Sequence, residues 1–157
     1  MDRPIRKQNR LKDFDYSRTG VYFITVCTHR KQCMFWENVG ASTARPPLTE
    51  QGNLVDAAIN EIPRKYQAVR VDHYVIMPNH IHLLLSINAD ENGRALPAPT
   101  ISHVVQQMKG AVTKQLGRSI WQKGFYEHIV RGERDYREIW EYIDKNPSKW
   151  LDDEYCN

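Results

Sequence analysis

The chain has 157 residues, of which 41% are hydrophobic and 26% charged, and its formal net charge is +3. This length is sufficient for one domain with an apolar core, and no apolar run reaches the length of a membrane span. The three cysteines lack a Cys-x-x-Cys spacing, which argues against a disulfide framework and against a cysteine zinc site. Because the N-terminus is charged and carries no apolar signal segment, we expect a cytoplasmic protein that does not associate with membranes.

The first part of the chain predicts an arm followed by a strand. Residues 1–18 are polar and basic, and we interpret them as an N-terminal arm in front of a single domain over 19–157. A β-branched and aromatic run over 20–28 predicts a strand that is buried on both faces. A helix follows, with Thr49 as its N-cap, and Pro63 is expected to break or kink it before the pattern resumes to Val69. The apolar spacing predicts that this helix buries Leu54, Ala57, Ala58 and Ile62.

The second half of the chain alternates between strand and helix patterns. The expected elements are a hairpin of strands over 71–77 and 80–87, a helix capped by Thr100 or Ser102 and ended by Gly117, a short strand over 126–130, and a helix over 135–146 that Pro147 stops. The order β-α-β-β-α-β-α predicts an α+β fold, namely a ferredoxin-like split β-α-β antiparallel sheet with two helices on one face. The last helix is additional and is free to lie across the other face.

Two histidines stand on the same side of the central predicted strand. His80 and His82 are two residues apart, and because side chains alternate along a strand they share one face, while Ile81 and Leu83 share the other. Two imidazoles on a rigid strand form a bidentate platform for a metal ion. The alternative is a pair of core histidines bonded to the backbone, and the pair alone does not decide between the two.

The last helix adds a phenol and an amide one turn apart. Tyr142 and Asn146 stand at i and i+4 and therefore lie on one helix face, beside the apolar stripe of Tyr136, Ile139, Trp140 and Ile143. Together with the two histidines they would supply a nucleophile and a third metal ligand, with which a divalent ion could polarise a phosphodiester while the tyrosine attacks it. The alternative is that Tyr142 is an amphipathic boundary residue and Asn146 only ends the helix.

Three segments together resemble a known family. They are Pro78-Asn79-His80-Ile81-His82-Leu83-Leu84, the block from Trp121 to Arg131, and Tyr142-Ile143-Asp144-Lys145-Asn146-Pro147. The first is similar to the His-hydrophobe-His signature of the single-tyrosine HUH transposases. The other two, with the strand over 20–28, resemble the REP-associated tyrosine transposases, so that the resemblance spans nearly the whole chain.

The resemblance implies a function and assigns roles to residues. It implies a single-stranded DNA transposase and endonuclease that cuts and rejoins DNA next to hairpins through a 5′-phosphotyrosine intermediate, with Mg²⁺ or Mn²⁺ as cofactor. By this resemblance His80 and His82 are metal ligands, Tyr142 is the nucleophile and Asn146 completes the metal site. Related insertion-sequence transposases have Gln at the position of Asn146. Histidine and amide ligands favour Mn²⁺ over Mg²⁺.

The partner implied by the resemblance is single-stranded DNA with a hairpin. Cationic and aromatic side chains are the groups that bind single strands, and the candidates are Arg6 and Arg10 of the arm, with Lys109, Lys114, Arg118, Trp121 and Tyr126. Relatives include both dimers and monomers, and we favour a homodimer. Two alternatives stay open, namely a catalytically silent DNA-hairpin-binding protein on the same scaffold and a metal-dependent hydrolase that does not use the tyrosine. Among the tyrosines, Tyr126 and Tyr136 compete with Tyr142 for the role of nucleophile.

Overall fold

The computed structural model describes residues 20–37, 46–88 and 100–152, and the arm predicted over 1–18 lies outside them. At the centre of the fold lies a sheet of four antiparallel strands in the order β2-β3-β1-β4. The strands are β1 (Gly20–Cys27), β2 (Val69–Ile76), β3 (His80–Ile87) and β4 (Tyr126–Ile129). The helices are α2 (Glu50–Lys65), α3 (Ile101–Leu116) and α4 (Gly132–Lys145), with short 3₁₀ turns η1 (His29–Lys31) and η2 (Pro147–Asp152). The predicted ferredoxin-like α+β fold is confirmed.

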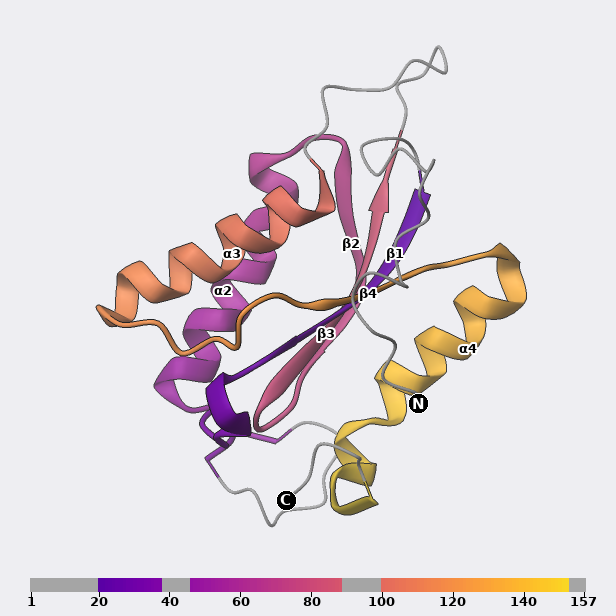
Figure 1. Cartoon of the computed structure of the whole chain (residues 1–157). Coiled ribbons are helices and arrows are strands. Elements are labelled where there is room, and N and C mark those ends of the chain that lie inside the picture. Colours follow the sequence, from indigo (N-terminus) through magenta and orange to yellow (C-terminus); the bar gives the residue numbers. More distant parts are fainter. Residues whose placement is uncertain (1–19, 38–45, 89–99, 153–157) are drawn as a thin grey trace.

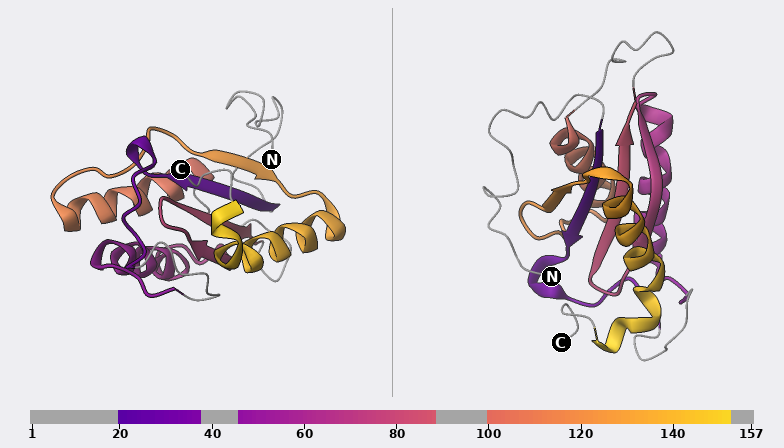
Figure 2. Two further views of the ribbon diagram at one scale, coloured as in Figure 1. Left: turned by 90° about the horizontal axis from the view of Figure 1, so that it is seen from below. Right: turned by 90° about the vertical axis from the view of Figure 1, so that its right-hand side faces the viewer.

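The helices form two unequal layers. Helices α2 and α3 lie together on one side of the sheet, and α4 lies on the other (Figure 1). Viewed from the side, α4 passes in front of the strands and η2 continues beyond its end (Figure 2). The prediction that the last helix covers the free face of the sheet is therefore correct.

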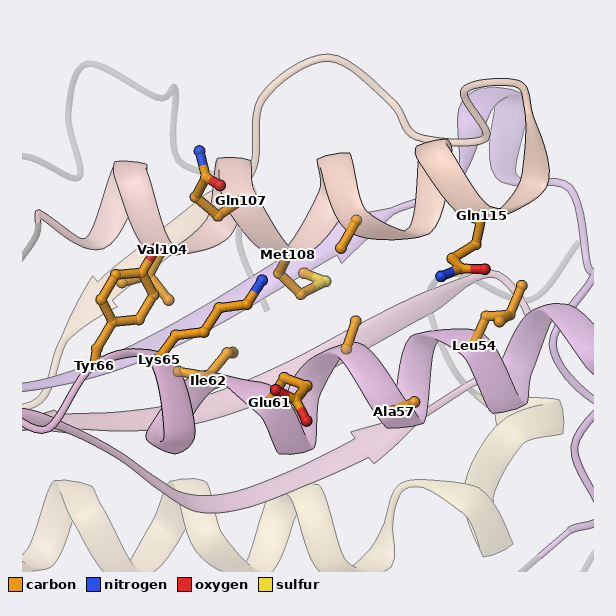
Figure 3. Close-up of a pocket in the computed structure, with 12 residues that line it drawn as sticks. Leu54, Ala57, Glu61, Ile62, Lys65, Tyr66, Val104, Gln107, Met108 and Gln115 are labelled. Carbon is orange, nitrogen blue, oxygen red and sulfur yellow. The ribbon is translucent and has the colours of Figure 1, made fainter.

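Most of the apolar core lies between the sheet and the α2–α3 layer. On this side β1 contributes Tyr22, Ile24 and Val26, while β3 contributes Ile81, Leu83 and Leu85. Between α2 and α3 there is a groove of about 360 Å³ with largely apolar walls, which include Leu54, Ala57 and Met108 (Figure 3). Its lining also includes the polar side chains of Glu61, Lys65 and Tyr66.

Two details of α2 differ from the prediction. The helix runs through Pro63 and ends at Lys65, so the expected break and the extension to Val69 are both wrong. Pro63 removes only the bond to the carbonyl of Ile59, while the buried Ile59 and Ile62 keep this last turn against the sheet. The buried stripe is Gly52, Val55, Ile59 and Ile62, so that Leu54, Ala57 and Ala58 lie at its side.

The other helices follow the sequence signals more closely. Thr100 caps α3 by accepting a hydrogen bond from the backbone N–H of His103, and Gly117 ends it in the left-handed conformation with φ of 77°. Helix α4 begins at Gly132, three residues before the predicted start. Ile139 and Ile143 are its buried residues, whereas Trp140, predicted to belong to the packing stripe, is 38% exposed.

None of the helices in the described ranges is long and apolar enough to cross a membrane.

Candidate functional site

The histidine pair lies on the α4 side of the sheet, at the start of β3. His80 and His82 are both completely buried, and their ring centroids are 4.7 Å apart. Their faces are set by the antiparallel register, in which Cys27 of β1 lies opposite His80 and Thr25 lies opposite His82. The prediction that the two side chains share a face is consistent with this arrangement.

Each imidazole is oriented by a polar neighbour that the sequence reasoning did not identify. The Nδ1 atom of His80 is 2.8 Å from Oδ1 of Asn79, and Nδ1 of His82 is 2.9 Å from the hydroxyl of Thr25. Because an amide oxygen only accepts hydrogen bonds, His80 must donate from Nδ1, which makes Nε2 the basic nitrogen of its neutral ring. The Asn79 amide is itself fixed, since its Nδ2 donates to the carbonyl of Lys31 over 3.2 Å.

Burial keeps both histidines neutral. Desolvation lowers the pKa of His82 to about 3. The pKa of His80 is also well below its usual value, first because of burial and then because of the nearby charges of His82 and Lys31. Neutral imidazole is the form that binds metal ions, so at neutral pH the pair is in the protonation state that a ligand needs.

Tyr142 lies directly beside this pair. Its ring centroid is 5.3 Å from that of His82 and 6.1 Å from that of Phe23, which in turn stacks on His82 at 5.2 Å. Tyr142 is 36% exposed, whereas the histidines below it are covered. The arrangement places a partly exposed tyrosine ring beside one of two buried imidazoles, where a bound polymer can reach it.

Asn146 lies on the chain segment between Tyr142 and Trp150, whose rings lie beside His82 and His80. It is the C-cap of α4 and is buried, and its amide nitrogen donates to the backbone carbonyl of Tyr142 over 3.2 Å. Four residues later, Trp150 lies with its ring 6.2 Å from that of His80. Asn146 therefore lies, along the chain, between two residues that contact the histidine pair. Its amide oxygen is the atom suited to a cation.

The nitrogen and oxygen atoms of these side chains suit a divalent ion that accepts both kinds of ligand. Among the described residues no three His, Cys, Asp or Glu side chains are grouped so as to hold a metal ion. A site here would therefore depend on two neutral imidazoles, the Asn146 amide and oxygen atoms from substrate or water. Such a set suits Mn²⁺ better than Mg²⁺, which prefers oxygen ligands throughout.

The residues predicted to bind DNA are not gathered at this site. Lys109, Lys114 and Arg118 belong to α3 or follow it, in the layer on the far side of the sheet from the histidines (Figure 1). Lys109 donates to the carbonyls of Gln122 and Gly124, over 3.0 and 3.1 Å, and so holds the segment that leads into β4. Arg6 and Arg10 lie outside the described residues.

The two aromatic candidates for DNA binding have different environments. Trp121 is 7% exposed and its indole N–H donates to the carbonyl of Lys109. In this structure the ring offers little surface to a base, and the role of Trp121 in DNA binding stays a prediction. Tyr126 is half-buried opposite Thr25, on the α4 side of the sheet, and stays a candidate.

The chain is similar in sequence to known proteins. No protein-family model matches the chain. An uncharacterized protein of Haemophilus influenzae is 34% identical, in an alignment that covers 95% of this chain and 92% of the relative. A REP-associated tyrosine transposase of Escherichia coli is 25% identical, over 85% of this chain and 70% of the relative.

A solved structure has the same fold. It is that of a REP-associated tyrosine transposase bound to a REP hairpin, with a TM-score of 0.62 and 24% sequence identity, and the match covers 90% of this chain and 74% of that one. Together with the named relative, this agrees with the resemblance carried by the histidine pair and the tyrosine helix. In sequence and in fold the chain is therefore similar to the REP-associated tyrosine transposases.

Proposed function

We propose that this protein is a metal-dependent single-stranded DNA endonuclease and strand transferase, with Tyr142 as its nucleophile. The observation that carries the proposal is the position of the Tyr142 ring beside His82, which is itself beside His80, all within one chain. Similarity to the named tyrosine transposases supports the reaction class. The phenol is partly exposed above two buried imidazoles, as an attacking group needs to be.

In the proposed cleavage, the Tyr142 oxygen attacks a phosphorus atom of the DNA backbone. The phenol gives up its proton to solvent, an O–P bond forms between Tyr142 and the 5′ phosphate of the strand downstream of the cut, and the bond from phosphorus to the 3′ oxygen of the upstream strand breaks. The departing 3′ oxygen takes a proton and becomes a free hydroxyl. Reversal of these steps by another 3′ hydroxyl rejoins a strand, which makes the same site competent for transfer.

The metal ion would be held by His80, His82 and Asn146. Bound there, Mn²⁺ or Mg²⁺ would supply Lewis-acid polarisation of the phosphodiester. Asn79 and Thr25 hold the two imidazoles in place, and burial keeps both rings neutral. Phe23 supports His82 from one side and restricts water around the ring.

The proposed DNA partner is a single strand next to a hairpin. The support is the relative of the same fold that is bound to a REP hairpin. A hairpin stem is held largely through its phosphates, so we expect binding to weaken steeply with salt. Tyr142 lies beside His82 of its own chain, which supports a site that one protomer can supply. The homodimer stays a prediction.

A covalent-adduct assay tests the proposal. The protein is incubated with Mn²⁺ and labelled single-stranded oligonucleotides from hairpins that flank its gene, and the products are separated on a denaturing protein gel. We expect a labelled protein band in the wild type that is lost in Tyr142→Phe and in His80→Ala. Tyr66→Phe, at the end of α2 on the other side of the sheet, is the matched control and should retain the band.

The alternatives give different results in the same assay. Hairpin binding in a gel shift without any adduct would favour the catalytically silent binding protein. Cleavage that survives in Tyr142→Phe without an adduct would favour the hydrolase. A labelled band that survives in that variant would mean that another tyrosine attacks, and Tyr126 would be the next to replace.

A further inference from the structure

Strand β2 contains a bulge that faces the tyrosine helix. In the pairing with β3, Val71 lies opposite Leu85 and His73 lies opposite Leu84, so Asp72 is an extra residue in the ladder. Successive side chains of a regular strand point to opposite faces, and a bulge can turn two neighbours to the same face. Here Asp72 and His73 both contact residues of α4.

Asp72 is a buried carboxylate with donors on both oxygens. Its side chain is 5% exposed. Oδ2 accepts from the hydroxyl of Tyr136 over 2.8 Å and from that of Ser86 over 2.5 Å, and Oδ1 accepts from Nε of Arg70 over 2.9 Å. Hydrogen bonds to a charged and desolvated acceptor are strong and directional. The phenol of Tyr136 is therefore held at one point on the sheet.

His73 makes the second contact to α4, one turn further along the helix. Its ring stacks on Trp140 with centroids 4.3 Å apart and an interplanar angle of 24°. Its Nε2 lies 3.4 Å from Oδ1 of Asp144. Tyr136 and Trp140 are four residues apart and lie on the same flank of the helix. The bulge thus holds α4 at two successive turns of this flank.

Tyr142 lies on the other flank of α4. It follows Trp140 by two residues, which is about 200° around the helix axis at 3.6 residues per turn. Between the flanks, the buried Ile139 and Ile143 pack on Phe23 and Leu84. Apolar packing holds the helix down but is not directional, so this small patch leaves the rotation of α4 about its axis to the polar contacts.

We propose that the Asp72 bulge is a positioning element that fixes the rotation of α4 and thereby the approach of the Tyr142 hydroxyl to the histidine pair. The inference rests on the proposed function, because it assigns Asp72 and Tyr136 a task in that reaction. A tyrosine hydroxyl lies far from the helix axis, so a small rotation of the helix moves it much more than it moves the backbone. Misplacement of a reacting group by about 1 Å can reduce a rate by about a hundredfold.

The chain offers a matched pair of variants for the test. Tyr136→Phe removes the phenol–carboxylate bond that joins α4 to β2. Tyr74→Phe removes a similar bond on the opposite face, in which Tyr74 of β2 donates to Asp56 of α2 over 2.5 Å. We expect both variants to lose a similar, small amount of thermal stability. Only Tyr136→Phe should lower the kcat of cleavage, by about tenfold or more, with KM for the hairpin oligonucleotide unchanged.

Two results would overturn the proposal. One is an unchanged kcat in Tyr136→Phe, and the other is an equal loss of kcat in Tyr74→Phe, which would indicate a general structural effect. His73→Ala and His73→Phe extend the test, because Phe restores the stack on Trp140. We expect His73→Phe to recover most of the kcat that His73→Ala loses, and a failure to recover it would count against a role for the stack.

A spectroscopic measurement separates this inference from the proposed reaction. Fluorotyrosine is incorporated at position 142, and its ¹⁹F resonance is compared in the backgrounds of wild type, Tyr136→Phe and Tyr74→Phe. We expect a shifted or broadened resonance in Tyr136→Phe alone. This readout does not need cleavage, so a wild type that forms no adduct would refute the proposed function while the ¹⁹F result still decides whether the bulge positions Tyr142. An unchanged resonance in Tyr136→Phe would overturn the positioning role.

Discussion

The two faces of the sheet are built in different ways. The face toward α2 and α3 is covered by a large continuous apolar cluster that contains Ile24, Leu83 and Val105. The face toward α4 has a small cluster of four buried side chains in the described part of the chain, namely Phe23, Leu84, Ile139 and Ile143. Around it lie the histidine pair, Tyr142 and the contacts of the Asp72 bulge.

The two faces contribute differently to the stability of the fold and to the position of α4. Burial of apolar area stabilises the fold wherever the side chains fit together, and the α2–α3 face contributes most of it. On the α4 face little apolar area is available, and directional hydrogen bonds and ring contacts decide where the helix sits. The residues of the candidate site therefore lie on the α4 face, where the position of the helix depends on these directional contacts.

The largest expected effect comes from neighbouring leucines on opposite faces. Leu83 and Leu84 are both completely buried on β3, with Leu83 in the large cluster and Leu84 in the small one. Leu83→Ala should lower the free energy of unfolding by about 2–5 kcal/mol, and Leu84→Ala should fall at the lower end of that range, because fewer neighbours surround it. Urea unfolding measures both, and a greater loss in Leu84→Ala would contradict the comparison.

The next effect is a loss of folding stability in acid, which comes from the buried histidines on the α4 face. The pKa of His82 is about 3 in the folded state, against about 6.5 in an unfolded chain. Between these values the unfolded state binds more protons, so stability is complete above pH 6.5 and falls as the pH drops toward 3. In the presence of a chelator, we expect a loss of about 1 kcal/mol per pH unit from His82. His80, whose pKa is also lowered by burial, adds to the loss in the same direction.

Variants of the histidines sharpen this test. His82→Leu should flatten the dependence of stability on pH in the window from 6.5 to 3, as measured by thermal unfolding. His103→Leu replaces an exposed histidine on α3 and serves as the control. A profile as steep in His82→Leu as in the wild type would show that His82 is not the source of the acid sensitivity.

The smallest expected effect is at high pH, where the two tyrosine–aspartate bonds of β2 are lost. Burial and the bond to Asp72 raise the pKa of Tyr136 to about 12, and the pKa of Tyr74 is also raised, first by burial and then by its bond to Asp56. Both groups bind their protons more tightly in the folded state, so their contribution is present below pH 10. We expect stability to decline from pH 10 toward 12, and Tyr136→Phe to remove part of that decline.

The sequence predicts the parts of this molecule that depend on local pattern. Strand β3 has the predicted bounds, and the alternation of side chains along it puts His80 and His82 on the face away from Ile81. Thr100 and Gly117 mark the ends of α3 because capping depends on the chemistry of individual residues. The spacing of Tyr142 and Asn146 marks them as candidates on the last helix, the resemblance assigns their roles, and the structure brings Tyr142 beside His82.

The parts that depend on pairing between distant segments could not be predicted. The partner of His82 is Thr25, which is 57 positions away in the sequence and reaches it only through the register of β1 and β3. The bulge at Asp72 leaves no local signal, because its neighbours read as an ordinary strand. Trp121 is of a residue type that can stack on bases. Only the folded structure shows that its ring is buried and that its indole N–H donates to Lys109 of α3.

The bulge also has a consequence for insertions and deletions in β2. Asp72 is the extra residue in the ladder, so a chain that lacks it would pair as a regular strand, with Val71 and His73 keeping their present faces and partners. The sheet would remain in register, and only the carboxylate under Tyr136 would be lost. A single inserted codon is therefore enough to add the anchor of the tyrosine helix to a sheet that pairs equally well without it.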